Sequence, residues 1–444
     1  MTQDNNTIPN PGLDMIDRSA TIIKVIGVGG GGNNAINHMY KQNIENVSFV
    51  VCNTDAQALH NSPVPKRLLI GPTVTKGLGA GNNPDAARLA AEESAEEISE
   101  LFDDNTKMVF ITAGMGGGTG TGAAPVVARI AREKKMLTIG IVTIPFLFEG
   151  EKKILKALAG ADEMSKYVDA LLVINNERLT EIYKDIDFLD AFGKADDTLS
   201  TAARSISELI TCNGRINLDF NDVNTTLKDG GVAIISSGFG EGEHRVTEAI
   251  LDALNSPLLK NRDVEGSKRI LFNLYYSTQS ERPFVTSEAA ELTDFMAKFA
   301  PEVDVIWGVA FDDTLGDKVK ITILAAGFQV TLSDDQPTFK GRKNLGEDVE
   351  APKNTSTDAD RIGDVYGRDK VAKRQQDMAR ARYLVLTPEQ LDNDEVVEMV
   401  EKSPTFNRDV KFKEAIRDAT LPTKEPVPQK TGDTVAGAST ISFM

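Results

Sequence analysis

Short apolar runs alternate with amphipathic stretches from residue 21 to about residue 173. The apolar runs are rich in valine and isoleucine and predict buried strands at Thr21–Val28, Val47–Asn53, Met108–Ala113, Leu137–Ile144 and Ala170–Ile174. The amphipathic stretches predict helices at Asn34–Lys41, Pro84–Leu101, Ala124–Lys135 and Lys152–Tyr167. This alternation is typical of a parallel sheet covered on both faces, in which ligands bind beyond the carboxyl ends of the strands.

A long helix predicted at Ala195–Leu209 separates this part from a second unit, and Gly214 is a suitable stop for the helix. The second unit mixes strands at Val232–Ser237, Arg269–Ser277, Val303–Ala310 and Lys318–Ala325 with helices at His244–Leu254 and Glu288–Phe299. The last two strands are close in sequence, so they predict an antiparallel hairpin. The second unit is therefore expected to be of the α+β type.

The pattern changes after about residue 331. Ser333–Arg380 is polar, with mixed charges and prolines, and predicts a flexible linker that we place at residues 332–395. Apolar residues return in Val396–Val410, whereas residues 411–444 are polar again and predict a disordered tail. Residues 1–20 are also polar and are expected to be disordered.

Composition excludes several classes of protein. The net charge of −17 disfavours a general nucleic-acid role, which needs a basic surface. The two cysteines, Cys52 and Cys212, form no metal-binding or disulfide pattern, so we expect a reducing compartment and no metal held by a protein cluster. No targeting signal is evident at the start of the chain, and no apolar run approaches 18 residues. We therefore expect a cytoplasmic protein that is not inserted into a membrane.

Two glycine-rich loops, Gly27–Asn34 and Gly114–Gly122, each follow a predicted strand and precede a predicted helix. Such loops direct backbone N–H groups and a helix dipole at one place, which suits phosphate. Neither loop contains the lysine of a P-loop. The second loop also carries Thr119 and Thr121, and a third glycine stretch, Gly77–Pro84, precedes another helix. Together they indicate a polyphosphate ligand.

The first loop alone is compatible with an NAD-dependent oxidoreductase. Gly27, Gly29 and Gly32 satisfy G-x-G-x-x-G, and Asp55 lies roughly where an acid that binds the ribose is expected. This alternative leaves the second loop unexplained, and no catalytic pair of histidine and carboxylate stands out. A nucleoside triphosphate explains both loops.

The segment Asn217–Val223 places Asn217, Asp219 and Asp222 just after the long helix, at the end of the first unit remote from the glycine loops. A solvated loop edge is the simplest explanation of such a pattern. If these side chains have a catalytic role, they would act on a phosphate bound by a neighbouring molecule.

The loop Gly114–Gly122 and six further segments resemble motifs of the tubulin/FtsZ family, in the version of its FtsZ branch. The resemblance extends from Lys24 to about Phe328 and includes the signature Gly114–Gly122. The other matching segments are Val25–Gly32, Asn53–Leu59, Gly77–Gly81, Pro145–Gly150, Leu189–Gly193 and Asn217–Val223. This resemblance implies an α/β fold with a parallel-sheet GTPase domain (residues 21–194), a central helix (195–214) and a C-terminal α+β activation domain (215–331).

The same resemblance implies a self-assembling GTPase of bacterial cell division. It would polymerise head to tail into filaments that form the ring at midcell, and it would bind GTP or GDP together with Mg²⁺. Residues 396–410 would dock on membrane-tethering division proteins. A relative that uses GTP only to fold or assemble is a further possibility, which the presence of Asp219 and Asp222 disfavours.

The resemblance also implies roles for individual residues. Phosphate would be held by the two glycine loops through Gly30, Gly31, Gly32, Asn33, Asn34, Gly117, Gly118, Thr119 and Gly120. The ribose or guanine would be contacted by Glu149, Asn176, Phe192 and Asp196. Asn217, Asp219 and Asp222 would enter the next subunit's nucleotide pocket and polarise the attacking water.

Three positions depart from the family pattern. Lys153 stands where an arginine is usual, and it keeps the positive charge but lacks the bidentate fork. Glu151 replaces a customary lysine nearby. Asn33 replaces a glycine of the first loop, a mild change because asparagine tolerates unusual backbone angles. Nucleotide affinity or turnover is thus expected to differ from that of relatives.

Overall fold

The computed structural model describes residues 21–42, 44, 46–182, 188–212, 214–255, 267–296, 303–328, 358–374 and 388–402. It contains two compact units, the first ending at Arg368 and the second beginning at Asp369. The disordered segments predicted at residues 1–20 and 411–444, most of the predicted linker, and residues 403–410 of the predicted docking peptide lie outside the described residues.

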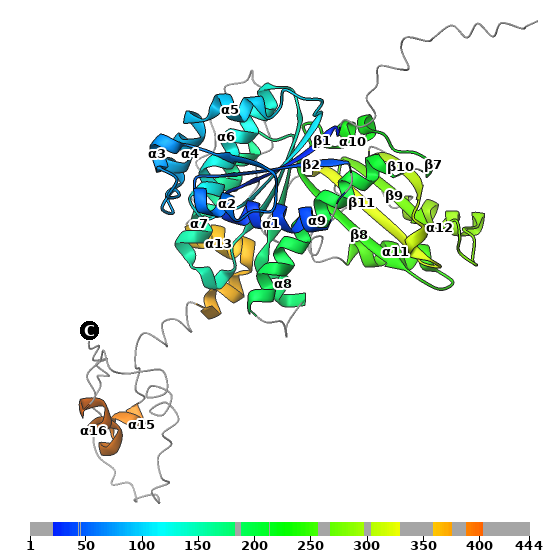
Figure 1. Ribbon diagram of the computed structural model, residues 1–444. Coiled ribbons are helices and arrows are strands. Elements are labelled where there is room, and N and C mark those ends of the chain that lie inside the picture. Colours follow the sequence, from blue (N-terminus) through cyan, green and yellow to red (C-terminus); the bar gives the residue numbers. More distant parts are fainter. Residues whose placement is uncertain are drawn as a thin grey trace, which may run out of the picture. The chain divides into compact units, whose positions relative to one another are not determined.

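The first unit is built on one sheet in the order β3-β2-β1-β4-β5-β6-β8-β11-β9-β10-β7 (Figure 1). The strands before the long helix are β1 (Ile23–Val28), β2 (Val47–Asn53), β3 (Lys66–Leu69), β4 (Met108–Gly114), β5 (Leu137–Ile144) and β6 (Ala170–Asn175). Those after it are β7 (Gly214–Ile216), β8 (Gly231–Gly240), β9 (Arg269–Tyr276), β10 (Asp304–Phe311) and β11 (Val319–Phe328). The first six pair in parallel, and β1, β4 and β5 are buried along nearly their whole length, as expected for a sheet covered on both faces.

Helices connect these strands. The first group comprises α1 (Gly29–Lys41), α2 (Ala56–His60), α3 (Pro72–Thr75), α4 (Pro84–Glu93), α5 (Ala95–Glu100), α6 (Thr119–Glu133), α7 (Glu151–Ser165) and α8 (Asn176–Ile182), with the 3₁₀ turn η1 (Leu147–Glu149). The second comprises α9 (Phe188–Thr211), α10 (Phe220–Leu227), α11 (Arg245–Leu254), α12 (Thr286–Met296), the turn η3 (Asp313–Leu315) and α13 (Asp358–Tyr366). The compact unit that begins at Asp369 contains α15 (Pro388–Leu391) and α16 (Asp394–Lys402).

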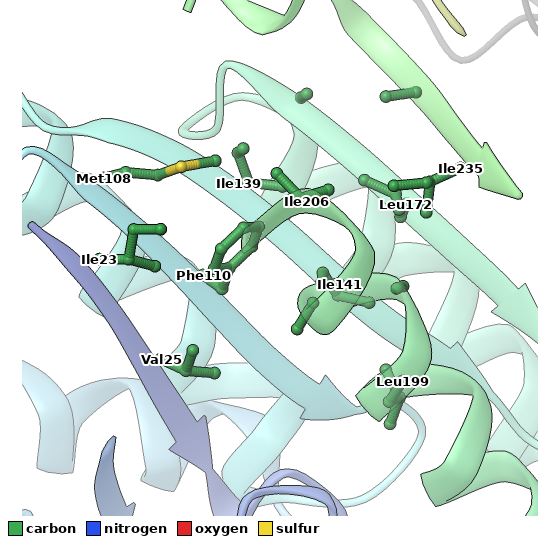
Figure 2. Close-up of a cluster of buried hydrophobic side chains, with 14 of the residues drawn as sticks. Ile23, Val25, Met108, Phe110, Ile139, Ile141, Leu172, Leu199, Ile206 and Ile235 are labelled. Carbon is green, nitrogen blue, oxygen red and sulfur yellow. The ribbon is translucent and has the colours of Figure 1, made fainter. Parts of the chain in front are cut away.

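The long helix α9 is the central element of the core. It begins seven residues before the predicted start, and its 24 residues span about 36 Å. Figure 2 shows Leu199 and Ile206 of α9 beside strand residues such as Phe110 and Ile141, in a cluster that also includes Ile235 of β8. One hydrophobic cluster therefore joins the two halves of the chain through α9.

The two halves share the sheet as well as the core. Ala170 and Leu171 of β6 pair in parallel with Gly231 and Val232 of β8, so the sheet continues from the first half into the second. The α+β character predicted for the second half is present, because it mixes parallel and antiparallel pairs. The halves are nevertheless parts of one compact unit.

The predicted antiparallel hairpin of the last two strands is wrong. β10 pairs in parallel with β9 and antiparallel with β7, while β11 lies between β8 and β9. The apolar side chains of β11 explain this position, since Ile321, Ile323 and Leu324 are fully buried and alternate between both faces. A strand buried on both faces belongs in the middle of a sheet, not at its edge.

The predicted flexible linker needs a correction between residues 358 and 366. This segment forms α13, which packs on α7 of the first unit, with Ile362, Val365 and Tyr366 buried. Its acidic surface residues gave the segment the composition of a linker. Three buried apolar side chains are enough to anchor a short amphipathic helix to an existing surface.

Candidate functional site

The two glycine loops lie at the carboxyl ends of β1 and β4, which are neighbours in the sheet. Helices α1 and α6 begin inside the loops, at Gly29 and Thr119, five residues before each predicted start. Neither helix has a side-chain cap or an acidic residue in its first turn. Their first N–H groups and positive dipole ends are therefore available to an anion.

The glycines let the two loops touch backbone to backbone. A Cβ atom on Gly29 would lie 2.7 Å from the nitrogen of Gly120, and one on Gly31 would lie 3.1 Å from Cα of Gly114. Gly30 and Gly117 differ from the other glycines of these loops, because a Cβ there would meet nothing within 4 Å. They border open space in which a phosphate group can lie.

The third glycine stretch packs against the signature loop. A Cβ on Gly118 would lie 3.0 Å from the nitrogen of Asn83, and one on Gly122 would lie 1.9 Å from the oxygen of Pro84. Asn83 caps α4 by accepting from the N–H groups of Asp85 and Ala86. All three glycine segments thus belong to one surface.

The polar side chains Thr119, Thr121 and Asn33 of the loops form hydrogen bonds that hold the loop backbone in place. Thr121 accepts from the N–H of Gly116 at 2.9 Å, and the Thr119 hydroxyl lies 2.7 Å from that of Thr54. Asn33 is 3 % exposed, and the amide orientation that satisfies both of its polar atoms places its nitrogen within 3.2 Å of the carbonyls of residues 27, 29 and 52. Asn33 therefore shapes the first loop from inside, whereas Asn34 is exposed at its surface.

The loop after β5 supplies Glu149, and α7 supplies Lys153 from its first turn. One Glu149 oxygen accepts from the N–H of Phe146 at 2.8 Å, and the other forms an ion pair with the ammonium of Lys153. The signature loop touches this region, since a Cβ on Gly116 would lie 2.8 Å from the oxygen of Lys153. Glu149 and Lys153 are thereby held beside the phosphate loops.

Two polar side chains of the predicted site, Asn176 and Asp196, are wholly or partly buried. The Oδ1 atom of Asn176, at the start of α8, is buried without a hydrogen bond. Burial, together with the neighbouring Asp197, raises the pKa of the Asp196 carboxyl in α9 to about 7. A buried amide oxygen without a hydrogen bond and a carboxyl with a raised pKa are suited to a ligand that carries N–H groups. Phe192 also lies in α9, but its side chain is outside the described residues.

Asn217, Asp219 and Asp222 form a separate group at the other end of α9. Asp219 caps α10 by accepting from the N–H of Asn221 at 2.7 Å, and Asp222 accepts from the N–H of Asp219 at 2.8 Å. Asn217 accepts from the N–H of Gly214 at 2.6 Å. Asn217 and Asp219 are exposed.

The length of α9 keeps the two groups apart within one molecule. Asp196 is in the third turn of α9, and β7 with the Asn217 segment follows its last turn. The 16 residues from Asp196 to Thr211 alone span about 24 Å. The carboxylates therefore cannot act on a phosphate held by the glycine loops of the same chain.

Three residues near the loops were not singled out from the sequence. Thr54 contacts Thr119, Glu177 accepts from the N–H of Leu147 at 2.8 Å, and Asn175 caps α8 by accepting from the N–H of Glu177. Each follows the carboxyl end of a strand, and that position was an available signal. Among the described residues no group of three or more histidine, cysteine, aspartate or glutamate side chains is arranged to hold a metal ion.

Three family models match the chain. The GTPase domain of the tubulin/FtsZ family matches residues 22–184, and the C-terminal domain of the FtsZ family matches residues 231–329. A further FtsZ C-terminal model matches residues 379–422, which include α15 and α16. No described helix has the length and hydrophobicity needed to cross a membrane.

Similar proteins cover most of the chain. Cell division protein FtsZ of Porphyromonas gingivalis is 51 % identical over 395 residues, which are 87 % of this chain and 85 % of that protein. A solved FtsZ dimer of M. jannaschii is 39 % identical and has a TM-score of 0.64, covering 71 % of this chain and 91 % of that one. A GTPγS-bound CetZ2 protofilament of Haloferax volcanii shares the fold at 18 % identity and a TM-score of 0.58, covering 69 % and 93 %.

Proposed function

Because the chain belongs to the tubulin/FtsZ family and is a GTPase of bacterial cell division, we propose that it polymerises head to tail and completes its active site between adjacent subunits. One observation carries the proposal. The glycine loops and the Asn217–Asp222 segment lie at opposite ends of α9, a helix of about 36 Å. A filament of identical subunits brings the two ends together.

In this proposal one subunit binds the nucleotide. Backbone N–H groups at the starts of α1 and α6 hold the phosphates, with Gly30 and Gly117 bordering the space they fill. Asn176 and Asp196 hold the guanine, whose N1–H and 2-amino groups match a carboxylate acceptor. Glu149 accepts from the ribose, and Lys153 keeps Glu149 in place. An adenine base offers no such pair of donors, so guanine is preferred.

The next subunit supplies Asn217, Asp219 and Asp222. Phosphoryl transfer needs mainly positioning and charge stabilisation, so two carboxylates that orient a water molecule are sufficient chemistry. Asp219 and Asp222 stabilise each other's backbone through a capping box, which holds both at one end of α10. Asn217 and Asp219 are exposed and Asp222 is half-buried, so these side chains are available to a neighbouring molecule.

Mg²⁺ is proposed to enter with the nucleotide. It typically binds through phosphate oxygens and water with one or two carboxylates at most, so the lack of an acidic cluster among the described residues is compatible with it. When bound, it would neutralise charge on the phosphates. The chain's own task there is to hold the phosphates on the two helix starts.

The cellular role is proposed from relatives. The similar structures include an FtsZ dimer and a CetZ protofilament, which supports assembly of this chain into filaments. The name of the relative, cell division protein, supports a place for these filaments in the ring at midcell. Residues 396–410 are proposed to bind membrane-tethering division proteins, and the FtsZ C-terminal model covers that segment. The apolar positions of α16 are compatible with such a partner.

A titration of GTPase activity against protein concentration tests the split site. The rate per molecule should rise steeply with concentration, because an isolated subunit has only half of the active site. A rate per molecule that is constant down to nanomolar protein would refute the proposal.

The variant Asp219→Asn tests the role of the carboxylates. Asparagine is as good a helix cap as aspartate, so α10 should keep its start while the charge is lost. GTP binding should be unchanged, and hydrolysis should fall about a hundredfold or more, as expected for a residue that assists proton transfer. Loss of GTP binding would contradict the proposal that Asp219 acts in hydrolysis and not in binding.

Sedimentation with GTP, GDP and a non-hydrolysable GTP analogue distinguishes this proposal from the alternative that the protein uses GTP only to fold or assemble. Filaments should form with GTP or the analogue and should disassemble as GTP is consumed. Filaments that persist equally with all three nucleotides would favour the assembly-only alternative.

A further inference from the structure

Helix α13 lies far along the chain from the GTPase domain, yet it packs beside a loop of the candidate site. We propose that α13 is a strap that positions the segment Pro145–Gly150, with Tyr366 as the positioning residue for nucleotide binding. This inference rests on the proposed nucleotide site, because its consequence is the placement of Glu149. It assigns a role to a segment whose sequence predicted only a linker.

Three kinds of contact fix α13 on the first unit. Ile362 is 3 % exposed and packs with Val365 in the apolar face of the helix. Arg361 forms an ion pair with Asp162 of α7 at 2.8 Å. The carbonyl of Val365 accepts from Nδ2 of Asn175 at 3.1 Å, at the end of β6. Apolar burial, charge and a hydrogen bond therefore all define the same docking position.

Tyr366 connects the strap to the loop. Its side chain is buried, and its hydroxyl donates to the carbonyl of Pro145 at 2.5 Å. Burial, with Glu177 and Glu149 nearby, raises the pKa of the phenol, so the hydroxyl keeps its proton and stays a donor.

The loop is held at three successive residues. Pro145 accepts from Tyr366, Phe146 donates to Glu149, and Leu147 donates to Glu177. Two of these bonds come from the GTPase domain, whereas the Tyr366 bond comes from a residue 221 positions later. Since Glu149 is part of the same turn, movement of Pro145 would move the carboxylate proposed to contact the ribose.

Asn175 extends the connection to the base end of the site. Its Nδ2 donates to α13, and its Oδ1 accepts from the N–H of Glu177 in the first turn of α8. That turn also contains Asn176, whose unpartnered Oδ1 is proposed to face the guanine. The strap therefore contacts both segments that flank the sugar and the base.

The variant Tyr366→Phe in the full chain tests the strap with minimal change to packing. It removes only the hydroxyl, so the melting temperature should be nearly unchanged. Dissociation of a fluorescent GDP analogue from dilute protein should become about threefold to tenfold faster, the effect of one lost hydrogen bond. The amides of Phe146 and Leu147 should exchange hydrogen faster.

Ile362→Asp provides a second variant that displaces the whole helix by burying a charge in its apolar face. It should accelerate GDP dissociation at least as much as Tyr366→Phe, and it should expose α13 to protease. Asp358→Asn, on an exposed residue of the same helix, is the matched control and should behave as wild type.

These outcomes separate the strap from the proposed function. Wild-type protein that does not bind the GDP analogue would refute the nucleotide site itself. Wild-type protein that binds it, with Tyr366→Phe and Ile362→Asp releasing it at the wild-type rate, would refute the strap. Faster release in both variants with unchanged melting of Tyr366→Phe would establish α13 as a positioning element.

Discussion

Single glycines decide whether the two phosphate loops can meet. Gly120 shows the constraint most clearly, since a Cβ there would lie 2.5 Å from the oxygen of Gly114. Gly117 is in the same loop and a Cβ there would meet no atom within 4 Å. The loop therefore contains glycines of two kinds, one required by backbone contact and one bordering the ligand space.

The pair Gly120→Ala and Gly117→Ala tests this distinction. Gly120→Ala should destabilise the protein by about 1–3 kcal/mol, the usual cost of overpacking, and should weaken GTP binding. Gly117→Ala should leave thermal stability unchanged. Differential scanning calorimetry of both variants measures the difference, and equal melting temperatures would contradict the contact argument.

Asp196 gives the site a pH dependence. Its pKa in the free protein is raised to about 7, mainly by burial, and guanine N–H groups favour the ionised form. Nucleotide binding thus requires loss of the proton below pH 7. GDP affinity should be constant above about pH 7.5 and should fall by up to about tenfold per pH unit below 7.

A titration of GDP affinity between pH 8.5 and 5.5 measures this effect. Asp196→Asn is the control, because it cannot titrate and reports any contribution from the phosphates of the nucleotide. An identical pH profile for wild type and Asp196→Asn would exclude Asp196 as the titrating group.

The sequence predicted which glycines and carboxylates belong to the candidate site. It did not predict which polar side chains are buried or which of them have hydrogen-bond partners. The spacing of Gly30 and Gly117 predicted phosphate loops, whereas the interior position of Asn33 depends on carbonyls from two different strands. The lack of a partner for Asn176 also depends on what surrounds it in space. Such features arise from tertiary contacts, which a local pattern does not contain.

At the scale of elements, α9 both supports the core and separates the two parts of the site. Ile206 is fully buried in the cluster shared by the two halves of the chain (Figure 2). The helix's apolar periodicity predicted its existence, but its first two turns were missed. A rigid α9 keeps Asp196 and Asp219 at a fixed separation.

Ile206→Ala tests how far the core depends on α9. The substitution should cost about 2–5 kcal/mol, because it leaves a cavity that the packed cluster cannot fill. Leu251→Ala, at a half-exposed position of α11, is the control and should cost much less. Urea unfolding of both variants measures the free energies, and similar losses would show that α9 is not central to the core.

The elements that the sequence did not predict depend on partners distant in the chain. The sequence of β11 predicted one strand of a hairpin. Because both of its faces are buried, β11 instead lies between β8 and β9. The sequence of α13 predicted a linker, because the contacts that hold the helix come from distant parts of the chain: α7, the Pro145 loop and Asn175. The order of strands in the sheet and the packing of α13 on a distant part of the same chain are set by tertiary contacts. Periodicity within each segment does not determine them.

At the scale of the whole molecule, we propose that one chain holds two complementary halves of a GTPase site. A head-to-tail contact uses different surfaces on the two subunits, and such contacts repeat into an open filament. The family resemblance predicted both halves from the sequence, and the length of α9 gives the physical reason why we expect them to serve different molecules. In the proposed mechanism, catalysis is a property of the filament.

A mixture of two inactive variants tests this claim most directly. Gly117→Asp places a carboxylate in open space facing the phosphates, so it should block GTP binding without disturbing the fold. Asp219→Asn should bind GTP but lack the activating charge. The mixture should regain up to about a quarter of the wild-type rate, since one in four random head-to-tail pairings joins an intact pocket to an intact Asp219. Asp219→Asn mixed with Asp222→Asn should stay inactive, and a first mixture as inactive as its components would contradict the shared site.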